Sequence, residues 1–147
     1  MKKRIVCSPR ISKSPDETFD IAKELASKIN APCLIGLTGE LGTGKTVFAK
    51  GFAYGLGIRD LITSPTFLGM IEYPSIAFIH MDFFKKVVPK ENIESYLNVK
   101  SIVLIEWIEN FSYVFKETLD LDIRICIKYL KDRSGNILEN VREIIIE

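Results

Sequence analysis

A glycine-rich segment with a distinct pattern on either side constrains the fold of this chain most. Residues 39–46 read GELGTGKT and fit the spacing G-x-x-x-x-G-K-[ST]. The preceding run CLIGLT, residues 33–38, predicts a buried strand, and Phe48, Phe52 and Leu56 recur after it at the spacing of one helical face. A chance match in a glycine-containing turn is the alternative. The order of strand, glycine loop and helix favours an α/β fold with a phosphate-binding site.

The residue types of this loop suit the binding of a nucleoside triphosphate. Glycines let main-chain N–H groups converge on phosphate oxygens at the positive end of a helix. We expect the Lys45 ammonium to reach the β- and γ-phosphates, and the Thr46 hydroxyl to hold Mg²⁺. The residues of the loop that we predict to bind the nucleotide are Glu40, Gly42, Thr43, Gly44, Lys45 and Thr46.

Composition narrows the class of protein. The 147 residues, 1–147, are predicted to form one domain. A formal net charge of +1 argues against a generally basic nucleic-acid binder. Cys7, Cys33 and Cys126 form no C-x-x-C pair, which is typical of the reducing cytoplasm. The apolar run after the basic residues 2–4 is too short for an export signal, and we expect no membrane span.

Strand and helix patterns continue along the rest of the chain. We expect a short strand at 5–7, a helix at 15–30, strands at 67–73 and 76–82, a helix at 89–98, a buried strand at 101–106, and a tail hairpin of strands at 121–129 and 137–146. The continuous apolar run 102–105 is typical of a parallel sheet covered on both faces. The predicted fold is therefore an α/β, P-loop NTPase-like three-layer sandwich, with a mostly parallel central sheet and an antiparallel C-terminal hairpin.

Two acidic residues stand at the carboxyl ends of predicted strands. Glu106 ends the run 102–105, where an acid faces the crevice outside the strand ends, and we predict that it holds Mg²⁺ with Thr46. Asp82 ends another apolar strand, with His80 two residues earlier on the same face. One acid would support the metal and the other would orient water. An exposed acid at a strand end is the alternative for Glu106, and a hydrogen-bonded core histidine is the alternative for His80.

Four segments in this order resemble the bacterial TsaE family: GELGTGKT at 39–46, SPTF at 64–67, HMD at 80–82 and IEW at 105–107. The resemblance implies a small ATPase of tRNA threonylcarbamoyladenosine synthesis that binds ATP with Mg²⁺ and hydrolyses it slowly. It implies the TsaB and TsaD proteins as partners, which modify adenosine 37 of tRNAs decoding ANN codons, so that tRNA is reached indirectly through the complex. Hydrolysis would reset that complex after each turnover.

The resemblance also implies roles for individual residues. Lys45 would contact the phosphates, Thr46 and Glu106 would hold Mg²⁺, Thr66 would belong to a switch, and Asp82 would serve catalysis. The catalytic residues are thus predicted to be Asp82, Thr66 and Lys45. Trp107, the only tryptophan, follows the metal acid as in the family, and its residue type alone suggests a packing anchor.

The tail and two motif borders add further expectations. Arg133 would approach the adenine or ribose, as a tail residue does in relatives, and an exposed turn arginine is the alternative. The family usually continues its H-x-D motif with Leu-Tyr-Arg, whereas this chain has FFK at 83–85, and Ile108 stands where a proline is common. These departures leave the metal chemistry intact and concern partner contacts.

Three other functions use the same loop. A small-molecule kinase needs an arginine-bearing lid over the γ-phosphate, but the six arginines form no mid-chain cluster. A GTPase is disfavoured because the Asn-Lys-x-Asp motif for base recognition is absent. A nucleotide-gated binding module with negligible turnover stays open, because family members are slow when isolated.

Overall fold

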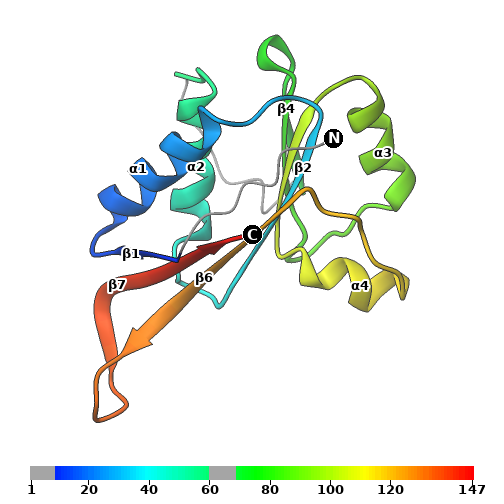
Figure 1. Cartoon of the computed structure of the whole chain (residues 1–147). Coiled ribbons are helices and arrows are strands. Elements are labelled where there is room, and N and C mark those ends of the chain that lie inside the picture. Colours follow the sequence, from blue (N-terminus) through cyan, green and yellow to red (C-terminus); the bar gives the residue numbers. More distant parts are fainter. Residues whose placement is uncertain (1–8, 60–68) are drawn as a thin grey trace.

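A seven-stranded mixed sheet forms the centre of the molecule in this computed structural model, which describes residues 9–59 and 69–147 (Figure 1). Its strands are β1 (Arg10–Ser12), β2 (Cys33–Gly39), β3 (Met70–Tyr73), β4 (Phe78–Asp82), β5 (Ile102–Glu106), β6 (Ile123–Lys131) and β7 (Ile137–Ile146). The helices of the described residues are α1 (Pro15–Ala26), α2 (Lys45–Gly55), α3 (Lys90–Asn98) and α4 (Glu109–Phe115), and Pro74–Ile76 forms a 3-10 turn, η1.

The sheet has a parallel centre and antiparallel edges. The strand order is β1-β7-β6-β2-β5-β4-β3, and the pairs β6–β2, β2–β5 and β5–β4 are parallel. The tail hairpin β6–β7 and the pair β3–β4 are antiparallel, as is β1 on β7. This confirms the predicted α/β fold with a mostly parallel core and an antiparallel C-terminal hairpin. The carboxyl ends of the parallel strands lie along the same side of the sheet, where β2 continues into the glycine loop.

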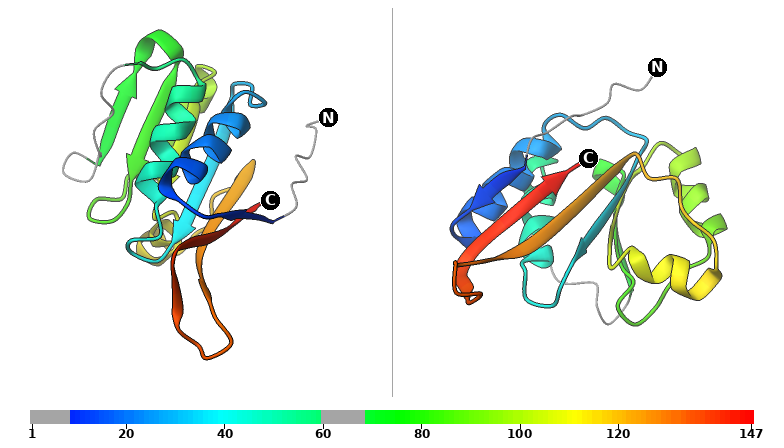
Figure 2. Two further views of the ribbon diagram at one scale, coloured as in Figure 1. Left: turned by 90° about the vertical axis from the view of Figure 1, so that its left-hand side faces the viewer. Right: turned by 60° about the horizontal axis from the view of Figure 1, so that its bottom comes forward.

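Helices cover both faces of the sheet (Figures 1 and 2). Helices α1 and α2 lie on one face and pack on Ile35 and Leu104, and α3 and α4 lie on the other and pack on Leu34 and Val103. Successive residues of one strand therefore enter opposite hydrophobic layers. This double burial explains the continuous apolar runs of β2 and β5.

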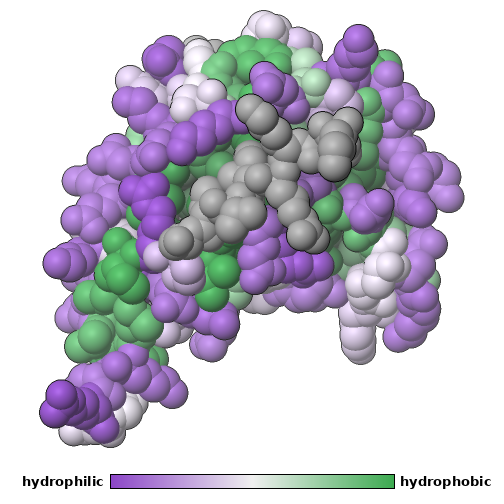
Figure 3. Space-filling model, viewed as in Figure 1, coloured by the Kyte–Doolittle hydropathy of each residue, from purple (hydrophilic) through white to green (hydrophobic). Residues whose placement is uncertain are grey.

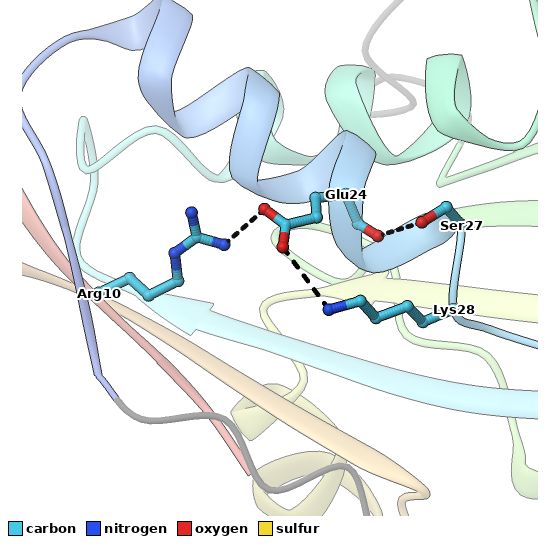
Figure 4. A network of polar contacts seen from close by, with 4 residues as sticks. All are labelled: Arg10, Glu24, Ser27 and Lys28. Carbon is cyan, nitrogen blue, oxygen red and sulfur yellow. Dashed lines mark hydrogen bonds and ion pairs between the residues drawn. The ribbon is translucent and has the colours of Figure 1, made fainter.

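Helix α1 begins as predicted but ends at Ala26 rather than at residue 30. Its start is capped by the Ser14 hydroxyl, which accepts from the Glu17 amide at 3.1 Å. Its end is closed by the Ser27 hydroxyl, which donates to the Glu24 carbonyl at 2.6 Å. Glu24 also pairs with Arg10 on β1 at 2.8 Å and with Lys28 at 3.5 Å (Figure 4). Both ion pairs are exposed to solvent, so each contributes little to the stability of the fold.

Two elements were not predicted, and some predictions lie outside the described residues. Strand β1 has only three residues, and α4 has only seven, so neither carries a clear period in the sequence. The predicted strand at 5–7, with Cys7, and the SPTF segment, with Thr66, fall in the ranges 1–8 and 60–68 that the structure does not describe. Within the described ranges, no helix is both long enough and apolar enough to cross a membrane.

Candidate functional site

The glycine loop joins the end of β2 to the start of α2. Gly44 precedes the first helical residue with a φ of 107°, a left-handed conformation that a residue with a side chain rarely adopts. The loop is closed upon itself, because the Thr43 amide donates to the Glu40 carbonyl at 3.2 Å and the Thr43 hydroxyl donates to it at 2.8 Å. The N-terminus of α2 thus presents main-chain amides and a positive dipole end, the features of an anion-binding site.

The Lys45 side chain lies back along the loop and is only 6% exposed. Its ammonium donates to the Gly39 carbonyl at 2.5 Å and to the Glu40 carbonyl at 2.9 Å, and it lies 4.1 Å from the centroid of the Trp107 ring. Burial lowers the pKa of Lys45 below its ordinary value, while the negative charge of Glu106 opposes that shift. A phosphate oxygen would offer this ammonium a charged acceptor, and charged acceptors form the stronger hydrogen bonds.

The two predicted acids are neighbours at the carboxyl edge of the parallel sheet. Asp82 ends β4, Glu106 ends β5, and the two are paired in register. Asp82 is 4% exposed and Glu106 is 1% exposed, which contradicts an exposed acid at a strand end. The Thr46 hydroxyl donates to Oε1 of Glu106 at 3.3 Å. The structure therefore brings together the hydroxyl and the carboxylate that were assigned to the metal.

His80 contacts the other oxygen of the same carboxylate. Its Nε2 lies 2.7 Å from Oε2 of Glu106, and both side chains are buried. The two oxygens of Glu106 are thus held by different groups, Thr46 on one side and His80 on the other. Asp82 is held by its own turn, since Oδ1 accepts from the Phe84 amide at 2.9 Å. Hydrogen bonds of this kind orient a carboxylate for a ligand.

A cavity of about 310 Å³ opens between the loop and the two acids. Six of the predicted residues line it: Gly42, Gly44, Lys45, Thr46, Asp82 and Glu106. Two aromatic residues, Phe84 and Trp107, complete its rim, with ring centroids 5.1 Å apart. Trp107 was predicted to be a packing anchor, and the structure places its ring at the cavity and under Lys45. Its φ of 56° is sparsely populated for a bulky residue.

The remaining predicted residues lie elsewhere. Thr43 is buried and bonded within the loop, and the Glu40 side chain is exposed while its carbonyl accepts from Lys45. Arg133 is exposed in the turn between β6 and β7 and does not line the 310 Å³ cavity.

Two tail residues that the sequence did not single out contact the loop instead. The Tyr129 hydroxyl donates to the Leu41 carbonyl at 2.7 Å, and Nε of Arg142 donates to the Thr43 carbonyl at 3.1 Å. Tyr129 belongs to the alternating pattern of β6, and Arg142 lies almost 100 residues from the loop. No local signal marks them, because the contact depends on how β7 pairs with β6.

The donor set at the cavity fits Mg²⁺. In residues 9–59 and 69–147, no three His, Cys, Asp or Glu side chains converge to form a self-contained metal site. Mg²⁺ at phosphate sites keeps several waters and binds one or two carboxylates together with phosphate oxygens. The Thr46 hydroxyl and the Glu106 carboxylate form a donor pair of this kind beside the loop.

A glycine loop between a parallel strand and a helix, with a hydroxyl facing an acid from the adjacent strand, defines a P-loop NTPase-like α/β protein. A family model described as "Threonylcarbamoyl adenosine biosynthesis protein TsaE" matches residues 12–135. The chain belongs to the TsaE family, which is involved in tRNA threonylcarbamoyladenosine biosynthesis. The family predicted from four short segments is thereby confirmed.

Relatives from several bacteria carry the same name, tRNA threonylcarbamoyladenosine biosynthesis protein TsaE. The protein of Bacillus subtilis is 35% identical over 129 residues, which cover 84% of this chain and 79% of that protein. The protein of Haemophilus influenzae is 35% identical over 106 residues, covering 67% of this chain and 65% of the relative. The crystal structure of Bacillus subtilis YdiB matches with a TM-score of 0.73 and 29% identity, over 95% of this chain and 83% of that one.

Proposed function

We propose that this protein is a Mg²⁺-dependent ATP-binding protein and slow ATPase that acts with TsaB and TsaD in the threonylcarbamoyl modification of adenosine 37 in tRNAs reading ANN codons. One observation carries the proposal: Lys45, Thr46 and Glu106 converge at the N-terminus of α2, at one cavity. Family membership supports the role in tRNA modification, and that role supports a cytoplasmic location.

Each side chain of the cavity has a separate task in this proposal. Lys45 exchanges its bonds to two loop carbonyls for bonds to phosphate oxygens. Thr46 and Glu106 hold Mg²⁺, which neutralises charge on the phosphates when it is bound. Asp82 lies in register with Glu106 at the next strand end, where its carboxylate orients the attacking water. His80 keeps Glu106 turned toward Thr46.

The first test is calorimetry with ATP and Mg²⁺. Wild-type protein is expected to bind ATP, and Lys45→Ala is expected to lose binding. Glu106→Ala is expected to weaken Mg²⁺-dependent turnover, which is measured as phosphate release. Lys50→Ala is the matched control, because Lys50 is exposed on the same helix. Wild-type protein that shows no affinity for ATP would contradict the proposal at its first step.

The second test measures phosphate release with and without the TsaB–TsaD pair. The proposal expects slow release by the isolated protein and faster release with both partners present. Equal and negligible release in both conditions would instead favour a nucleotide-gated binding module. A phosphorylated metabolite that accumulates faster than free phosphate would favour a kinase.

A further inference from the structure

The C-terminal hairpin holds the outer side of the glycine loop through three consecutive carbonyls. The Tyr129 hydroxyl donates to the carbonyl of Leu41 at 2.7 Å. Arg142 donates from Nε to the carbonyl of Thr43 at 3.1 Å, and from Nη2 to the carbonyl of Gly42 at the longer distance of 3.5 Å. The loop is thus bonded to strands that lie about 90 to 100 residues further along the chain.

The two side chains that make these contacts form one unit. Tyr129 on β6 and Arg142 on β7 are partners in the antiparallel register, so their side chains share a face of the hairpin. The guanidinium carbon of Arg142 lies 4.5 Å from the centroid of the Tyr129 ring, within the range of a cation–π contact. Arg142 also donates from Nη1 to the Val141 carbonyl at 2.9 Å. Contacts within the hairpin therefore hold the two side chains in place, in addition to their bonds to the loop.

The direction of the loop carbonyls determines the direction of the loop amides. In a planar trans peptide the C=O and the following N–H point to opposite sides. A Leu41 carbonyl that faces Tyr129 turns the Gly42 N–H away from the hairpin, and a Thr43 carbonyl that faces Arg142 does the same for the Gly44 N–H. Gly42 and Gly44 both line the 310 Å³ cavity.

Space at Gly42 allows this arrangement. A Cβ atom built on Gly42 would lie 2.8 Å from the Tyr129 hydroxyl oxygen, closer than two such atoms normally approach. The glycine therefore lets the hydroxyl reach the Leu41 carbonyl beside it, in addition to allowing the φ of 82° at this position.

We propose that Tyr129 and Arg142 are positioning residues for phosphate binding, which hold the glycine loop so that the amides of Gly42 and Gly44 face the phosphates. The proposal rests on the proposed function, because it concerns the same nucleotide site. In this proposal the tail hairpin acts by holding the loop, and Tyr129 does not contact the ligand.

The variants must separate positioning from simple charge. Arg142 also borders a second cavity, of about 140 Å³, between the loop and the start of α1, so its charge alone would attract a phosphate. Tyr129→Phe removes only the hydrogen bond to Leu41 and changes no charge. Arg142→Lys keeps the charge and loses the planar donors that reach two carbonyls of the loop and one of its own strand. Lys128→Ala is the control, because Lys128 is exposed on the opposite face of β6.

The test combines calorimetry with Mg²⁺ and either ATP or tripolyphosphate, and amide NMR of the ligand-free protein. Tyr129→Phe is expected to weaken both ligands by about threefold to tenfold, the effect of one hydrogen bond, and to shift the Gly42 and Gly44 amide resonances. Arg142→Ala and Arg142→Lys are expected to weaken binding alike. The double variant Tyr129→Phe with Arg142→Lys is expected to lose less than the product of the single losses, because both act on one loop. Lys128→Ala is expected to match wild type.

Four outcomes would overturn the assignment. Tyr129→Phe with wild-type affinity and unshifted glycine amides would show that the loop does not need the hairpin. Full recovery in Arg142→Lys would assign Arg142 a role through charge. Wild-type protein that binds neither ATP nor tripolyphosphate would overturn the proposed function and this assignment with it, whereas wild-type affinity in all variants would overturn the assignment alone.

Discussion

At the residue scale, the chemistry of the site depends on three charged side chains that share a buried space. Lys45, Asp82 and Glu106 are all nearly inaccessible to solvent, and the Lys45 ammonium faces main-chain carbonyls and the Trp107 ring. Burial weakens the hydration of each charge and strengthens its response to its neighbours. The pKa of Lys45 and the effect of removing His80, which contacts Glu106, therefore test the electrostatics of the site.

The Lys45 ammonium is expected to titrate below the ordinary lysine value of 10.5, because burial disfavours its charged form. Protonated lysine binds phosphate more tightly, so ATP affinity should fall as the pH rises through this lowered pKa. Glu106→Gln should lower the pKa of Lys45 further, since it removes a stabilising negative charge. NMR of the side-chain Cε resonance measures both shifts, with exposed Lys50 as the internal control. A Lys45 titration at or above 10.5 would contradict the prediction.

Removal of His80 is expected to affect both stability and metal dependence. His80→Ala leaves Oε2 of Glu106 buried without its partner, which costs about 1 to 3 kcal/mol of unfolding free energy. The Mg²⁺ concentration needed for ATP binding should rise about tenfold, as for other residues that orient a metal ligand. Urea unfolding and Mg²⁺ titration measure the two effects. His80→Gln, which retains an N–H donor, should recover part of each, and an unchanged Mg²⁺ requirement would contradict an orienting role.

At the element scale, the position of α2 determines where the glycine loop points, and α1 sets that position. A Cβ atom on Gly51 would lie 2.3 Å from the Phe19 carbonyl oxygen, and one on Gly55 would lie 2.6 Å from the Lys23 carbonyl oxygen. The two helices therefore touch backbone to backbone. Glycine usually weakens a helix interior, and here close packing offsets that cost.

Gly51→Ala is expected to destabilise the protein by about 1 to 3 kcal/mol, because the added methyl group forces α1 and α2 apart. The higher helix propensity of alanine would by itself stabilise the helix. A net loss of stability would therefore show that the steric effect is the larger of the two. Urea unfolding measures it, and Lys50→Ala on the exposed face of α2 is the control. A stabilised Gly51→Ala variant would show that the helices separate freely.

At the scale of the whole molecule, the tail hairpin β6–β7 and strand β1 form one antiparallel side of the sheet. The tail hairpin extends past the helices (Figure 2), and apolar side chains lie on it next to its hydrophilic tip (Figure 3). Ile11 on β1 and Ile137 on β7 are both about half exposed, at 47% and 56%. The hairpin nevertheless reaches the glycine loop through Tyr129, which donates to the carbonyl of Leu41, a residue that lines the cavity.

Ligand binding should stabilise the entire molecule if the proposed function is correct. ATP with Mg²⁺ at one hundred times its Kd adds about 2.7 kcal/mol to the free energy of unfolding. For a chain of this size that corresponds to a rise in Tm of about 5 to 10 °C. Thermal unfolding with and without the ligand measures the shift, which should vanish in Lys45→Ala. An equal rise in that variant would place the binding site elsewhere.

Features of the molecule that depend on neighbouring residues differ from those that depend on distant residues in how well the sequence predicts them. The glycine loop, the buried strands and the capped start of α1 were predictable because each depends on neighbouring residues. The apolar run before Glu106 also predicted correctly that this acid ends a strand of the parallel sheet. The end of α1 was wrong by four residues, since helix ends depend on local caps that compete closely in energy.

The sequence by itself determined the family, the α/β class and the position of the glycine loop between a strand and a helix, because these depend on residue types at fixed spacing along the chain. Only the tertiary structure decided which side chains surround that loop: the pairing of β4 with β5 brings Asp82 beside Glu106, and the pairing of β6 with β7 brings Arg142 to Thr43. Strand order and register are set by packing across the whole sheet. No short window of sequence contains that information.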